Sequence, residues 1–75
     1  MERKDAVALL KEISVTCESF RFAQSVSITF DKKKGCVLNV NWTPDSSENE
    51  ALSKILHNYD AEAVMANGRT VISSL

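Results

Sequence analysis

The segment from Val26 to Trp42 constrains the fold of this chain more than any other part of the sequence. Apolar and polar residues alternate on either side of Asp31–Gly35, which contains three lysines and a glycine. A period of two is typical of strands that have one face on a core and the other in water, because successive side chains point to opposite faces. The segment therefore predicts a β-hairpin whose loop is Asp31–Gly35.

One register of this hairpin matches apolar residues with apolar residues. The predicted pairs on the core side are Phe30 with Cys36, Ile28 with Leu38 and Val26 with Val40. A shift of one residue would turn the whole apolar set toward solvent, so the register should be well specified. The opposite, polar face would carry Ser25, Ser27, Thr29, Asn39 and Asn41. Phe30 and Trp42 share the parity of the core residues, so their rings are expected to be hidden.

An amphipathic helix is predicted from about Asp5 to Phe20. Its apolar positions recur at spacings of three and four, which places them on one stripe of an α-helix. They are Ala6, Leu9, Leu10, Ile13, Cys17 and Phe20. Val15 points away from this stripe and should be exposed. The end of the helix stays open, because Phe20 and Phe22 also fit the alternation of the strand that follows.

A second helix is predicted directly after the hairpin. Pro44, within Thr43–Ser46, cannot donate a ladder hydrogen bond and favours a turn, so it ends the strand. Ser47 and Glu50 have the spacing of a capping box, which marks a helix N-terminus. The inward stripe of this helix is Leu52, Ile55, Leu56 and Tyr59.

The segment from residue 60 to residue 66 has two interpretations. It could prolong the second helix, with Gly68 as its C-terminal cap. It could also be a strand that enters a type I′ turn at Asn67-Gly68, which would pair Ala66 with Arg69, Val64 with Val71 and Ala63 with Ile72. The strand-like end of the chain, Arg69–Leu75, needs a pairing partner, so we favour the hairpin.

The element order then predicts an α+β fold. It is a single αββαββ domain, residues 1–75, in which two helices lie on one face of a four-stranded, mainly antiparallel sheet. Moving the last strand to the front would give the βαββαβ order of a ferredoxin-like fold. The expected architecture is therefore a circularly permuted two-layer sandwich. The alternative is αββαβ with a long second helix.

Size and charge bound the function. A chain of 75 residues buries only about 60% of its unfolded surface, so support from a partner or a second copy is expected. The net charge is −1, which gives no overall attraction to nucleic acid or to an anionic membrane. The sequence contains neither a signal-peptide core nor an apolar run of membrane-spanning length. We therefore expect a soluble, cytoplasmic protein.

The residues that could carry chemistry are few. Cys17, Cys36 and His57 are the only soft metal ligands, and no Cys-x-x-Cys pair is present, so we expect no metal and no cofactor. Both thiols are expected to be buried and reduced, although a bond between them is conceivable. His57 precedes Asp60 by three residues, and this pair alone does not predict an enzyme.

Two functions from different classes follow. We favour a non-enzymatic interaction or regulatory module that acts through a sheet edge, a sheet face or a homodimer, with Val64, Val71 and Leu75 as the candidate interface. The alternative is a weak nucleic-acid binder. Its contacts would be Lys32, Lys33 and Lys34 in the hairpin loop, joined by Arg21 and Arg69 if these lie at the same end of the sheet.

Overall fold

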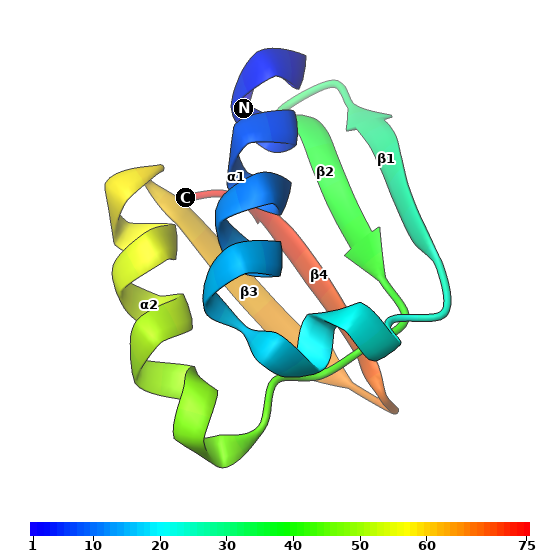
Figure 1. Ribbon diagram of the computed structural model, residues 1–75. Helices are drawn as coiled ribbons and strands as arrows, with labels where there is room; N and C mark the ends of the chain where they lie inside the picture. The colour runs from blue at the N-terminus through cyan, green and yellow to red at the C-terminus, as the bar shows by residue number, and fades with distance from the viewer.

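The computed structural model describes residues 1–75 as two helices on one face of a four-stranded antiparallel sheet (Figure 1). The main elements are α1 (Arg3–Thr16), β1 (Val26–Asp31), β2 (Gly35–Val40), α2 (Asn49–Asn58), β3 (Ala61–Ala66) and β4 (Arg69–Ser74). Two short 3₁₀ helices, η1 (Glu18–Phe22) and η2 (Ser46–Glu48), precede β1 and α2. The predicted αββαββ order is confirmed. No helix combines the length and the apolar character needed to cross a bilayer.

The strand order is β1-β2-β4-β3, and all neighbouring strands are antiparallel. The last strand, β4, therefore lies inside the sheet, between β2 and β3. If β4 came first in the chain, β4 and β2 would be the central first and third strands of a βαββαβ unit. This is the permuted arrangement that the sequence predicts.

Both hairpins have the predicted registers. In the first, Ile28 lies opposite Leu38, with the predicted pairs on either side of it. In the second, Val64 lies opposite Val71. The alternative with a long second helix is wrong, because α2 ends at Asn58 and residues 61–66 form β3. Asn67 and Gly68 have φ values of 54° and 75°, as a type I′ turn requires.

The core lies between the sheet and the two helices. Its buried apolar residues are Ala6, Leu9, Ile13, Cys17, Leu38, Val40, Trp42, Leu52, Ile55, Leu56, Ala61 and Ile72. The helical stripe and the strand alternation predicted most of this set. Val15, predicted to point away from the core, is exposed.

The first helix is shorter than predicted. It ends at Thr16, because Cys17 has extended dihedral angles, and η1 follows. This turn brings the Phe20 ring edge-to-face against the Trp42 indole, with 5.0 Å between ring centroids. Such aromatic pairs stabilise a packed core beyond the area that they bury. Tertiary packing therefore decides the helix end that the sequence left open.

The observed capping box lies two residues before the predicted one. The Asp45 backbone N–H donates to Glu48 Oε1 at 3.0 Å, so Asp45 and Glu48 form the box instead of Ser47 and Glu50. The chain consequently enters α2 through η2. Ser19 supplies the physical reason, because it also binds the Glu48 carboxylate and fixes it beside η1.

The expectation that both aromatic rings of the first hairpin are hidden is half wrong. Trp42 is 6% exposed, but Phe30 is 76% exposed. The reason is that the helices do not cover the strand that carries Phe30. The helices pack against β2 and β3, whereas β1 lies at the edge of the sheet, outside α1 (Figure 1). Strand alternation predicts which face a side chain occupies, but not whether a helix covers it.

A hydrogen-bonded cluster joins three segments beside η1. Ser19 Oγ donates to Glu48 Oε1 at 2.5 Å and accepts from Trp42 Nε1 at 3.0 Å, while the Ser19 N–H donates to Glu48 Oε2 at 3.1 Å. The buried Thr70 hydroxyl donates to the Trp42 carbonyl at 2.6 Å, which ties β4 to the same cluster. The hydrogen bonds from Ser19, with that from Asp45, lower the pKa of Glu48.

Replacing Leu38 by alanine tests the core. Leu38 is fully buried on β2, so Leu38→Ala should lower the free energy of unfolding by about 2–5 kcal/mol. Val15→Ala, at an exposed position, should change it by less than about 0.5 kcal/mol. Urea unfolding followed by circular dichroism measures both. Equal effects of the two substitutions would contradict the core assignment.

Acid should weaken the Glu48 cluster. Because folding lowers the pKa of Glu48, its contribution to stability is complete above the unfolded value of about 4.3 and is lost as pH falls through the lower, folded value. Glu48→Gln should therefore destabilise the protein near neutral pH. The difference from wild type should shrink near about pH 3. Urea midpoints of the two proteins across this range measure the effect, and a difference that does not depend on pH would contradict it.

Candidate functional site

The outer face of the sheet, opposite the helices, collects the polar side chains that the strand alternation predicts. It presents Ser25, Ser27, Thr29, Asn39 and Asn41 from the first hairpin, and Val64, Ala66, Arg69 and Val71 from the second. The pairing of β2 with β4 joins the two sets, because Asn39 lies opposite Val71. One surface therefore has a polar half and an apolar half.

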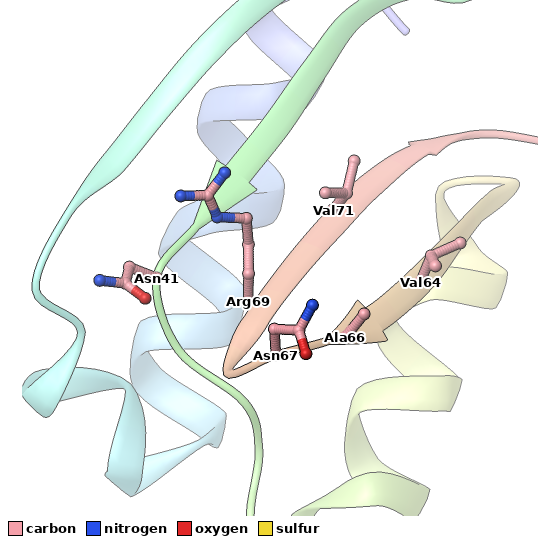
Figure 2. A pocket seen from close by; sticks show the side chains of 6 residues that line it. All are labelled: Asn41, Val64, Ala66, Asn67, Arg69 and Val71. Atoms are coloured by element: carbon pink, nitrogen blue, oxygen red, sulfur yellow. The ribbon is translucent and has the colours of Figure 1, made fainter.

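The apolar half contains a shallow hollow of about 370 Å³ beside the β3–β4 turn (Figure 2). Its lining is Asn41, Val64, Ala66, Asn67, Arg69 and Val71. Figure 2 shows Val64 and Val71 rising from neighbouring strands, with the Arg69 side chain extending between them and Asn41. Val64 is 62% exposed, so a ligand on this face would cover apolar surface that is now in water.

The polar half contains a second hollow of about 320 Å³. It is lined by Ser25, Ser27, Thr29, Asn39, Asn41 and Arg69. The amide of Asn39 donates to Thr29 Oγ1 at 3.0 Å, which holds that pair of side chains across β1 and β2. Asn41 and Arg69 line both hollows and so form the border between them.

Arg69 is the one charged residue that lines the two hollows. Its guanidinium makes no ion pair and no side-chain hydrogen bond, whereas Arg21, Lys34, Lys54 and Lys4 each pair with a glutamate. A guanidinium presents five N–H donors in a fixed plane and accepts nothing, so it suits a carboxylate or a phosphate. The candidate site is therefore an unpaired cation with apolar surface on one side and hydroxyl and amide groups on the other.

The structure brings two of the three predicted interface residues together. Val64 and Val71 are paired across β3 and β4 and line the apolar hollow. Leu75 lies beyond the far end of β4, where its N–H donates to the Asp60 carbonyl at 3.0 Å. Its exposed side chain is therefore not part of this surface.

The five predicted nucleic-acid contacts do not form one patch. Lys32, Lys33 and Lys34 lie in the β1–β2 loop, whereas Arg21 in η1 and Arg69 after the β3–β4 turn lie at the opposite end of the sheet. The two arginines were predicted to join the lysines only if they lay at the same end of the sheet, and they do not. The cause is topological, because η1 leads into the start of β1 and the lysine loop follows its end.

Two of the three lysines remain free of ion pairs. Lys34 Nζ lies 3.3 Å from Glu62 Oε1, across the sheet. The Asp31 carboxylate accepts the backbone N–H groups of Lys33 and Lys34 at 2.8 and 3.1 Å, which shapes the turn and lowers the pKa of Asp31. Lys32 and Lys33 therefore project from a loop with a defined backbone.

The two cysteines lie far apart. Cys17 lies directly after the C-terminal end of α1. Cys36 lies near the N-terminal end of the same helix, because its N–H donates to the Met1 carbonyl. A helix of the length of α1 spans about 21 Å, whereas a disulfide needs Cα atoms about 4–7 Å apart. Both thiols are free. Cys17 is buried as predicted, and burial, with a smaller effect of Glu48, raises its pKa, whereas Cys36 is only half-buried.

His57 does not form the acid–base pair that its spacing from Asp60 suggested. No side-chain hydrogen bond or ion pair joins the two residues, and the contact between them is a backbone one, from the Asp60 N–H to the His57 carbonyl at 3.2 Å. No group of three or more histidine, cysteine or carboxylate side chains is placed to hold a metal ion.

The proximity of Arg69 to Asn41 is what sequence reasoning missed. The strand alternation places each residue on the outer face, but it does not say which strands of the two hairpins are neighbours. The signal that could have found the pair is the adjacent apolar pair Val71 and Ile72, because a strand with apolar residues on both faces favours a position inside a sheet.

Comparison with known proteins returned no similarity: no family model matches the chain, and no curated protein or solved structure matches it significantly. The candidate site is therefore assigned from its geometry alone.

Proposed function

We propose that this chain is a non-enzymatic protein-interaction module that binds an extended segment of a partner protein on the outer face of its sheet. The observation that carries the proposal is the unpaired Arg69 guanidinium at the border of the two hollows. The partner segment presents a carboxylate to Arg69 and a small apolar side chain to Val64 and Val71.

The chemistry of the lining supports this assignment. Hydrogen bonds between a guanidinium and a carboxylate are charge-assisted and often bidentate, so they orient a ligand as well as hold it. The valine surface beside Arg69 gains from being removed from water. The hydroxyl and amide groups of the polar hollow provide partners for the backbone of an extended segment.

Binding suits this surface better than catalysis. The residues that line the two hollows contain no imidazole, thiol or carboxylate that could act as a general base beside Ser25, Ser27 or Thr29. The proposal also places the module in the cytoplasm, and the two free thiols support that location.

Display of random peptides tests the proposal. Peptides selected on the immobilised protein should be enriched in aspartate or glutamate next to small apolar residues. On titration of such a peptide, amide shifts in the NMR spectrum should concentrate at Asn41, Val64, Arg69 and Val71. Arg69→Gln should weaken binding about tenfold or more, because it removes charge-assisted hydrogen bonds.

The matched control is Arg3→Gln, which removes an exposed arginine from the helix layer and should leave the affinity unchanged. Peptides without an acidic preference, or equal binding by the Arg69 and Arg3 variants, would refute the proposal.

A second candidate is weak binding of single-stranded nucleic acid at the β1–β2 loop. The observation that favours it is the exposed Phe30 ring, which precedes Lys32 and Lys33 by two and three residues, since aromatic rings stack on bases and lysines contact phosphates. A labelled oligothymidine should then bind at low salt, and the slope of log affinity against log salt should be about −1.4 for two phosphate contacts. Loss of binding in a Lys32→Gln/Lys33→Gln variant would support this candidate, and an absence of binding at low salt would exclude it.

A further inference from the structure

The outer edge of β1 is open. β1 has a neighbouring strand on one side only, and its register with β2 is continuous from Val26 to Asp31, so no bulge interrupts it. From Val26 to Phe30 the strand contains no proline and no charged residue. Bulges, prolines and charges are the usual protection of an edge strand against pairing with another chain. β1 lacks all three along this stretch.

The backbone groups of Val26, Ile28 and Phe30 point to this open edge. In an antiparallel ladder, each residue directs both its N–H and its C=O to one side of the strand, and the next residue directs both to the other side. Cys36 lies opposite Phe30 and donates its N–H at 2.8 Å to the carbonyl of Met1, which lies on the β4 side. Phe30 therefore forms no backbone hydrogen bonds with Cys36, and its own N–H and C=O point to the open edge. Because the ladder alternates, the backbone groups of Ile28 and Val26 point to the open edge as well.

The same three residues carry apolar side chains that the helices leave uncovered. All three lie on the helix side of the sheet, where Phe30 is 76% exposed, Val26 is exposed and Ile28 is half-buried. Figure 1 shows β1 as the outermost strand, beyond α1. Free backbone groups and uncovered apolar side chains therefore coincide on one strand.

The geometry points to a homodimer in which β1 pairs antiparallel with β1 of a second copy, about a twofold axis at Ile28. The pairs on the helix side are then Ile28 with Ile28 and, twice, Val26 with Phe30. Every backbone group that points to the open edge along this stretch gains a partner. On the outer face Ser27 lies opposite Thr29, and Asp31 lies opposite Ser25, so no like charges meet.

Other registers fit less well. An axis at Ser27 would place Phe30 opposite Gln24, and an axis at Thr29 would place Val26 opposite Lys32. The other edge strand, β3, carries Glu62, which is paired with Lys34 of the same chain. A twofold pairing of β3 at Ala63 would place that carboxylate opposite Val64. The axis at Ile28 alone matches apolar with apolar along the whole strand.

This dimer leaves the partner site around Arg69 open, because it uses the backbone edge and the helix-side side chains of β1, whereas the polar hollow uses the outer-face side chains Ser27 and Thr29. Edge pairing would extend the sheet to eight strands and keep all four helices on one side, because the twofold axis is perpendicular to the sheet. The two outer faces would then form one surface with two copies of the Arg69 site.

Sedimentation equilibrium on the full chain, from about 5 to about 500 µM, tests the association. We expect a reversible dimer. Phe30→Lys should raise the dimer dissociation constant about tenfold or more, because it removes the ring that faces Val26 of the second copy. Phe22→Lys is the matched control, since Phe22 is 70% exposed on η1 and lies outside the proposed contact. A monomer at all concentrations, or equal effects of the two variants, would overturn the proposal.

Cross-linking tests the register. Ser27 of one copy and Thr29 of the other would form a pair without mutual hydrogen bonds, with Cα atoms about 4.5 Å apart, which suits a disulfide. In an oxidised mixture of Ser27→Cys and Thr29→Cys proteins, the mixed disulfide should exceed both homodisulfides, as measured by intact mass. Wild type provides the background from Cys17 and Cys36. A statistical mixture of the three products, or an excess of homodisulfides, would overturn the axis at Ile28.

Discussion

The pairing of β2 with β4 holds this molecule together. Each hairpin forms from residues close in sequence, and a two-stranded hairpin is marginal in water by itself. Three residue pairs join them: Leu38 with Ile72, Asn39 with Val71 and Val40 with Thr70. The side chains of the first and third pairs point to the helix side, and all four are completely buried beneath the helices. The Thr70 hydroxyl then connects this ladder to Trp42, and through Trp42 to the cluster of Ser19 and Glu48.

The same pairing creates the two surfaces to which we assign function. It brings the polar half of the outer face, from the first hairpin, next to the apolar half from the second, with Arg69 at their border. It also places β1 at an edge that two helices are too few to cover, which leaves Phe30 in solvent. A sheet of four strands with a helix layer of two thus accounts for both the proposed partner-binding surface and the proposed dimer edge.

Local patterns predicted the hairpins, their registers and the faces of their residues, because side-chain alternation and turn chemistry are set by neighbours in sequence. They failed where tertiary packing decides. The end of α1 depends on Phe20 reaching Trp42, the cap of α2 depends on Ser19 binding Glu48, and the exposure of Phe30 depends on where α1 lies. For the site, Val64 and Val71 were predicted together, whereas the separation of Arg69 from the lysine loop follows from the strand order.

The most direct measurement is therefore the contact between β2 and β4 in solution. Leu38 and Val40 share the parity of Cys36, whose N–H points to the β4 side, so Asn39 and Val71 form a pair without mutual hydrogen bonds. In such pairs the two Hα atoms lie close together. The account predicts a strong nuclear Overhauser effect between Hα of Asn39 and Hα of Val71. An Overhauser effect from Asn39 to a residue of β3 instead, or none to β4, would contradict it.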